Sequence, residues 1–416
     1  MSGQGEGPVA DAFAAKLSRL GVVRGATAKP VPSPAPPSRS TSPSTSPSTS
    51  PSLLTSPPTP GSLADGPTWL ASMPPALRER LRRTMAAAPV VAPTEFPLKP
   101  LPGGLSMRKN GAVHVAEWSV PRASLHGTAF LNAAHAERAK TAAAAARDPR
   151  FLSIDPDRWG YFDTETTSLN SGAGVWVFMV GVARFVGDEF RIRQFLLTGP
   201  AGEPAFLDAV REEFAAVDAL VSFHGKSFDA PRIDDRCRLA AFEDICSGRP
   251  HWDLLHATRR LYAPRWPDCR LRTAEERLLG FHRTDDLPGA ECPAQFFAFV
   301  RGGRHRMADV LEHNRLDTAS LAALAGRLAS DYTDPGDDPF LALMAGYDWS
   351  LTAESDLARG LLLRGVSAWG QCSASMREKI RRSLRRLGEK PLADSLRTLG
   401  AALADTSVRS QTTSVR

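Results

Sequence analysis

The sequence lacks the cysteine pattern of a disulfide framework or of a zinc site. Its cysteines are few, odd in number and widely spaced, and no two of them form a C-x-x-C pair. Such a set argues against both kinds of cross-link and is typical of a reducing compartment. The five cysteines are Cys237, Cys246, Cys269, Cys292 and Cys372.

The sequence also lacks a long apolar run. No stretch approaches the roughly 18 consecutive apolar residues that span a bilayer, and the opening residues lack the apolar core of a signal peptide. We therefore expect a soluble, cytoplasmic protein without membrane contact. Neither sign of charge dominates, since 51 Lys and Arg face 45 Asp and Glu for a formal net charge of +6. This mild excess is compatible with an anionic partner such as nucleic acid, but does not require one.

Proline, by contrast, is abundant and unevenly spread. Residues 29–62 are dominated by Ser, Pro and Thr, so they have too little apolar surface to offset the entropy of ordering. We expect residues 1–65 to form a disordered tail. Residues 66–148 predict an irregular N-terminal region with short strands, and residues 331–416 predict a helical, basic C-terminal region.

Residues 149–330 differ from their surroundings, because strand and helix patterns follow one another in short order. Three apolar or alternating runs joined by short turns predict an antiparallel meander. A helix, a buried strand and further helices come next. The runs begin near Trp159, at 175–186 and at 189–197. This order predicts an α/β domain whose mixed sheet combines a meander with parallel strands and is flanked by helices.

Two carboxylates, Asp163 and Glu165, stand near the end of the first predicted strand. Side chains two residues apart on a strand point to the same face. Paired acids on an apolar strand are costly to bury unless a cation joins them, and hard cations such as Mg²⁺ take oxygen ligands. For so short a pattern, the alternative is a half-buried strand with one solvated face.

Two further acids occupy meaningful positions downstream. Asp229 follows a buried strand and opens a helix, where it can approach a site at the strand ends or simply cap the helix. His313 and Asp317 are four residues apart on a predicted helix and share one face. The alternative for that pair is an ordinary surface His–Asp contact.

Together these motifs resemble the DEDD superfamily of 3′–5′ exonucleases. More narrowly, the sequence is similar to the YprB-like ribonuclease-H-like exonuclease family. The similarity rests on FDTETT, VSFHGKSFD, WDLLH, CRL, DDLPG and HNRLD, which occur in this order between residues 162 and 317. It implies a ribonuclease-H-like fold for residues 149–330, under half of the chain.

The resemblance also implies a metal-dependent hydrolase that removes nucleotides from the 3′ end of a nucleic acid, with a single-stranded end as the expected substrate. Two Mg²⁺ or Mn²⁺ ions would be held by carboxylates. Asp163 would bridge both ions, Glu165 and Asp317 would complete one site, and Asp229 would hold the second ion. His313 is the candidate general base, because its ordinary pKa suits proton transfer near neutral pH.

The chain departs from the family pattern at three positions. In the first motif, Ser168 stands where the family usually has glycine. His313 stands four residues before the last acid, where one subclass has tyrosine, and His224 replaces the usual asparagine of the second motif. Candidate substrate contacts are Thr164, His224 and Lys226. A structure-selective endonuclease of the same fold and a non-catalytic nucleic-acid-binding module remain alternatives, and the choice between DNA and RNA stays open.

Overall fold

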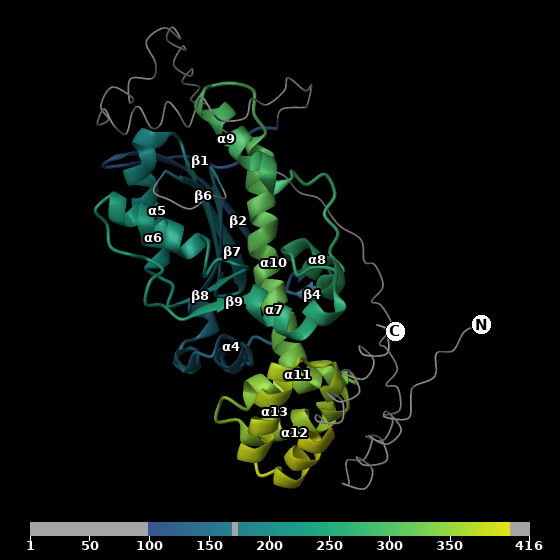
Figure 1. The fold of residues 1–416 in the computed structure, drawn as a ribbon. Coiled ribbons are helices and arrows are strands. Elements are labelled where there is room, and N and C mark those ends of the chain that lie inside the picture. Colours follow the sequence, from purple (N-terminus) through teal and green to yellow (C-terminus); the bar gives the residue numbers. More distant parts are fainter. Residues whose placement is uncertain (1–98, 169–173, 400–416) are drawn as a thin grey trace, which may run out of the picture. The chain divides into compact units, whose positions relative to one another are not determined.

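The structure is a computed structural model that describes residues 99–168 and 174–399 (Figure 1). The tail expected over residues 1–65 lies outside this part of the chain. The strands are β1 (Gly104–Arg108), β2 (Gly111–Pro121), β3 (Leu125–His126), β4 (Ala129–Phe130), β5 (Trp159–Thr166), β6 (Val177–Val186), β7 (Glu189–Leu197), β8 (Ala219–Ser222) and β9 (His251–Asp253). The helices are α4 (Arg138–Ala146), α5 (Glu203–Phe214), α6 (Asp229–Leu239), α7 (Leu254–Tyr262), α8 (Leu271–Ala274), α9 (Cys292–Val300), α10 (Met307–Thr333), α11 (Pro339–Trp349), α12 (Ser355–Gly365) and α13 (Ala374–Arg386).

A seven-stranded mixed sheet carries the site, with the order β1-β2-β7-β6-β5-β8-β9. Antiparallel pairing joins β1 to β2, β2 to β7, β7 to β6 and β6 to β5. Parallel pairing joins β5 to β8 and β8 to β9. Consecutive hairpins account for the meander, whereas the parallel strands need helical crossovers. This is the ribonuclease-H-like arrangement that the sequence predicts, and the expected fold class is confirmed.

β5 lies in the interior of the sheet, between the antiparallel and parallel parts. Its first four residues are buried, and the side chains of Trp159, Tyr161 and Phe162 are fully enclosed. Only Trp159–Tyr161 pair with β8, so the last residues of β5 extend beyond the end of their parallel neighbour. The carboxylates of β5 therefore lie where strand ends and loops meet, which is where open α/β sheets bind ligands.

Helices cover both faces of the sheet (Figure 1). The long helix α10 packs along β5, β6 and β7, whereas α5 packs against β2 and β7. Ion pairs identify the second face, because Glu213 of α5 contacts Arg184 of β6 and Arg193 of β7. Gln194, next to Arg193, instead points to α10 and donates to the carbonyl of Leu311 at 2.7 Å. Strand alternation thus separates the two layers.

The sheet begins before residue 149. The sequence suggests only short strands in the preceding region, but β2 is 11 residues long and pairs with β7 over Val113–Pro121. β1 then adds the edge strand. Beyond the sheet, α11, α12 and α13 follow α10, and residues 390–399 are helical. Across residues 99–168 and 174–399, no helix combines the length and the apolar character that crossing a bilayer demands.

Candidate metal centre

Three side chains from β5 and α10 meet at the end of the strand. Ligand atoms of Glu165, His313 and Asp317 lie within 4.8 Å of one another. His313 Nε2 is 3.5 Å from Asp317 Oδ2 and 3.9 Å from Glu165 Oε1. Glu165 and Asp317 are buried, so the His–Asp pair on α10 belongs to this cluster and is not an ordinary surface contact.

Asp163 joins the cluster through Asn314, its neighbour on α10. The amide of Asn314 donates to Asp163 Oδ2 at 2.9 Å. Gly181 makes this contact possible, because it is the partner of Asp163 in the β5–β6 register and a Cβ there would lie 2.1 Å from Asn314 Oδ1. The absence of a side chain on β6 therefore gives α10 access to the first acid.

A buried amide chain supports that contact. Asn314 is fully enclosed, and its Oδ1 accepts from Gln194 Nε2 at 2.9 Å. Gln194 Oε1 in turn accepts from Trp118 Nε1 at 2.9 Å. Each amide is thereby held in one orientation, so the sheet fixes the position of Asp163 from β2 through β7 to α10.

Asp229 approaches from the other face of β5. It is the first residue of α6 and buried, and its Oδ1 accepts a hydrogen bond from the hydroxyl of Thr164. Its charge raises the pKa of both Asp163 and Glu165, so it lies within electrostatic range of them. Thr164, a candidate substrate contact, is buried and engaged with an acid of the cluster.

The loop before Asp229 is held by Asp253. One oxygen of this carboxylate accepts from the backbone N–H of His224 at 2.7 Å and the other from that of Lys226 at 3.2 Å. Asp253 also caps α7 by accepting from Leu255 N–H. Both side chains that the sequence proposes as substrate contacts here, His224 and Lys226, are exposed.

The backbone of His224 explains why this position suits asparagine. Its φ is +71°, in the left-handed region that most side chains avoid and that Asn, Asp and His tolerate best. The turn therefore favours glycine, asparagine, aspartate or histidine over branched side chains. The His–Asn difference from the family pattern preserves the backbone geometry.

A hydrogen-bonded dyad orients His313. Its Nδ1 lies 2.8 Å from Asp286 Oδ1, so Nε2 faces Glu165 and Asp317. Behind the dyad lies Arg283, whose side chain is 4% exposed. Its guanidinium contacts Glu275, Asp286 and Asp317.

The pKa values of the cluster show that its negative charges are not fully compensated. Burial, reinforced by the charges of Asp317, Asp229 and Glu165, raises the pKa of Asp163 well above its usual range. Burial also raises the pKa of Glu165 to about 8 and that of Asp229 to about 6. Burial lowers the pKa of His313, but the hydrogen bond to Asp286 and the charges of Asp317 and Glu165 outweigh it and raise the pKa to about 9. Proton affinities of this kind indicate a place where a cation would be stabilised.

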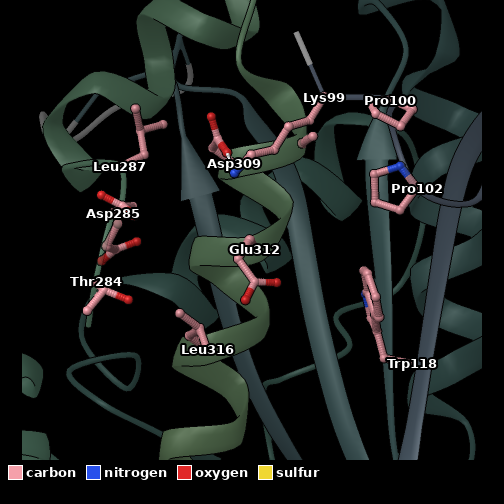
Figure 2. A pocket seen from close by; sticks show the side chains of 12 residues that line it. Lys99, Pro100, Pro102, Trp118, Thr284, Asp285, Leu287, Asp309, Glu312 and Leu316 are labelled. Carbon is pink, nitrogen blue, oxygen red and sulfur yellow. Dashed lines mark hydrogen bonds and ion pairs between the residues drawn. The ribbon is translucent and has the colours of Figure 1, made fainter. Parts of the chain in front are cut away.

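A pocket of about 460 Å³ opens beside the cluster (Figure 2). From α10, Asp309, Glu312 and Leu316 face this pocket, and Trp118 of β2 lies on its opposite side (Figure 2). Asp286 belongs to its wall. The Asp286–His313 dyad therefore lies between the pocket and the acids of β5.

The donor set suits a divalent ion. Carboxylate oxygens are the ligands that Mg²⁺ and Mn²⁺ prefer. A second group with ligand atoms within 4.8 Å, His135, Asp155 and Asp157, occurs elsewhere. That group is more open, because Asp155 is exposed and His135 and Asp157 are only partly buried.

The sequence does not predict a role in the site for three of its residues, Asn314, Arg283 and Asp286. Asn314 lies inside the HNRLD motif, and Asp286 lies inside DDLPG, so both motifs pointed to the region without assigning a role. Arg283 belongs to no motif and carries no local pattern.

Comparisons with known proteins agree with the fold. The model of the RNase_H_2 family, of the RNase H superfamily, matches residues 160–329. Uncharacterized protein YprB of Bacillus subtilis (strain 168) is 36% identical over 168 residues, which is 39% of this chain and 40% of YprB. The match thus spans less than half of the length of that relative. Residues 160–329 thus match the RNase H superfamily, and the chain is similar to YprB over 168 residues.

Proposed function

We propose that the domain at residues 149–330 is a metal-dependent 3′–5′ exonuclease. The observation that carries the proposal is the convergence of Glu165, His313 and Asp317 within 4.8 Å, with Asp163 and Asp229 in electrostatic range. One strand and two helices thus bring four carboxylates and an imidazole together. Such a concentration of titratable side chains is typical of a functional site and is not needed for folding.

The acids would hold two divalent ions, Mg²⁺ or Mn²⁺. Asp163 would be shared between them, Glu165 and Asp317 would complete one site, and Asp229 would serve the other. Bound there, the ions would supply the charge neutralisation and the activated water that phosphodiester hydrolysis requires. Asn314 would keep Asp163 in place by its 2.9 Å hydrogen bond, and Thr164 would do the same for Asp229.

His313 would act as the general base. With Nδ1 donating to Asp286, the ring presents Nε2 toward the acids. Without ions the ring stays protonated near neutral pH, because the contact with Asp286 and the nearby acids outweigh burial and raise the pKa of His313 to about 9. Ions bound among the acids would offset that negative charge, and Nε2 could then take a proton from an attacking water. A direct role as an ion ligand is the competing assignment, because Nε2 belongs to the same 4.8 Å group. Ion affinity separates the two roles, since loss of a ligand weakens binding and loss of a base does not.

The test is incubation of the full chain with 5′-labelled single- and double-stranded DNA and RNA. We expect a ladder of products shortened from the 3′ end in Mn²⁺ or Mg²⁺, and intact substrate with chelator. Cleavage of closed circular substrate would instead identify an endonuclease. Binding without any cleavage in either ion would identify a binding module and overturn the proposal.

A further inference from the structure

Arg283 is a cation built into the acid cluster. It lies in the irregular stretch that precedes α9, and its side chain is 4% exposed. The guanidinium bonds Glu275 through Nε at 2.9 Å and through Nη2 at 2.5 Å. Nη1 donates to Asp286 Oδ2 at 3.2 Å, and Nη2 also donates to Asp317 Oδ1. One side chain therefore connects three carboxylates.

In two of these carboxylates, one oxygen contacts Arg283 and the other faces His313. Asp317 gives Oδ1 to Arg283 and turns Oδ2 toward His313 Nε2, 3.5 Å away. Asp286 gives Oδ2 to Arg283 and Oδ1 to His313 Nδ1 at 2.8 Å. Each acid thus has one oxygen fixed by the guanidinium and one committed to the site. Asp317 would consequently offer an ion a single oxygen in a defined direction.

The guanidinium itself cannot swing aside, because it is anchored from behind. Glu275 is fully buried, and its Oε1 also accepts from Ser320 Oγ at 2.5 Å. Ser320 Oγ is in turn 2.7 Å from His126 Nε2. A planar fork with five donors can serve three acids at once, whereas the ammonium group of lysine is a point charge on a flexible stem.

We propose, on the basis of the proposed ion-dependent function, that Arg283 is a positioning residue that aims Asp317 Oδ2 at the ion and, through Asp286, aims His313 at the same place. Because it is enclosed behind these side chains, Arg283 itself contacts neither substrate nor solvent-borne phosphate. It sets the geometry in which the acid and the base act together.

Two simpler roles make different predictions. If Arg283 served only to neutralise buried Glu275, its replacement would lower stability and leave the ion affinity of the folded protein unchanged. If it merely stood in for an ion, its replacement would tighten ion binding by removing a competing charge. A positioning role alone predicts weaker ion binding in a protein that remains folded.

The experiment measures Mn²⁺ affinity by calorimetry and thermal stability for the full chain with Arg283→Lys. We expect Mn²⁺ affinity to fall about tenfold to a hundredfold, the usual effect of removing a group that orients a metal ligand. The matched control is Arg315→Lys. Arg315 of α10 donates two parallel hydrogen bonds, at 2.7 and 2.6 Å, to the carboxylate of Glu312 on the same helix, and this pair lies outside the cluster. It should bind Mn²⁺ as the unmodified chain does.

A second variant guards against loss of folding. Arg283→Gln combined with Glu275→Gln removes both buried charges together and should recover stability. Continued weak Mn²⁺ binding by this folded double variant supports positioning, whereas normal or tighter binding overturns it. Cleavage is assayed in parallel. A chain that binds Mn²⁺ and responds to Arg283→Lys but cleaves nothing refutes the nuclease assignment alone, and a chain that binds no Mn²⁺ refutes both.

Discussion

At the scale of single residues, the acids on β5 and α10 are expected to be essential for activity without being essential for folding. Asp163→Asn or Asp317→Asn keeps the size of the side chain and removes one negative charge from a cluster where burial raises the pKa of Asp163. We expect both variants to lose Mn²⁺-dependent cleavage. The melting temperature without ions should be kept or raised by Asp163→Asn, whereas Asp317→Asn weakens the contact with buried Arg283 and should lower it modestly. Cleavage assays and calorimetry on the same samples check this. Full turnover by either variant would contradict the ion-ligand roles.

His313 is expected to contribute to turnover more than to ion binding. Replacing it with alanine should lower the cleavage rate about 10²–10⁴-fold, the usual contribution of a general base. Because Asp286 orients the ring through a 2.8 Å contact, Asp286→Asn should lower the rate in the same direction. The measurement is kcat alongside Mn²⁺ affinity. A large loss of affinity in His313→Ala would show that the imidazole is a ligand.

The local sequence predicts some of these residues and not others, for a physical reason. Asp163 and Glu165 follow from strand alternation, and His313 and Asp317 follow from the helical repeat, so regular geometry places each pair on one face. Arg283 comes from an irregular stretch, where no period relates a side chain to a face. Its role depends on acids near and far in sequence, which become neighbours only after folding.

At the scale of elements, the register between β5 and β6 determines whether α10 can reach Asp163. Gly181→Ala would place a methyl group 2.1 Å from Asn314 Oδ1, so the amide must move and its contact with Asp163 is lost. We expect a loss of about 1–3 kcal/mol in stability, as for other overpacked sites, together with weaker Mn²⁺ binding. Gly104→Ala, with nothing within 4 Å of its new Cβ, is the matched control. Normal ion binding by Gly181→Ala would contradict the role of Asn314.

The elements themselves are largely predictable from sequence, but their partners are not. β6 and β7 carry apolar or alternating runs of 10 and 9 residues joined by a tight turn, and a hairpin is the local solution. β2 is longer still, with 11 residues, yet its partner β7 begins 68 residues after β2 ends, at Glu189. Nothing in a single sequence specifies so distant a pairing, and the contribution of β1 and β2 to the sheet is therefore missed.

At the scale of the whole molecule, a buried carboxylate ties the C-terminal helices to the domain that carries the cluster. Asp348 of α11 is fully enclosed and accepts from Arg260 at 2.6 Å, Tyr332 at 2.8 Å and Arg147 at 3.1 Å. Asp348→Ala leaves Arg260, whose side chain is 19% exposed, without its carboxylate, and we expect a cost of about 3 kcal/mol, the lower end for a broken buried pair. Urea unfolding measures it. The control is Asp334→Ala. Asp334 is exposed and lies 3.7 Å from Arg364, so its replacement should lower the free energy of unfolding by less than about 0.5 kcal/mol.

The charge imbalance of the cluster should also govern how stability depends on pH. Without ions, folding raises the pKa of Glu165 from 4.5 to about 8 and that of His313 from 6.5 to about 9. The folded state therefore holds these protons more tightly than the unfolded state, and their contribution to stability is lost as pH rises through the folded values. Other histidines oppose this trend only near and below their ordinary pKa, since burial lowers the pKa of His126 to about 4 and that of His251 to about 3.

The prediction is a melting temperature in chelator that falls between about pH 7 and pH 9, while saturating Mn²⁺ reduces or reverses the fall by taking the place of the protons. Scanning calorimetry at several pH values measures both curves. Glu165→Gln should flatten the chelator curve, because it removes one of the two titrating groups. A melting temperature that rises over this range in chelator would be inconsistent with the cluster as described.

The most direct measurement of the central claim is anomalous diffraction from crystals of the full chain grown with Mn²⁺. We expect an anomalous peak within coordination distance of carboxylate oxygens from Asp163, Glu165 and Asp317. A peak confined to the group of His135, Asp155 and Asp157, or the absence of any peak between β5 and α10 at saturating Mn²⁺, would contradict it.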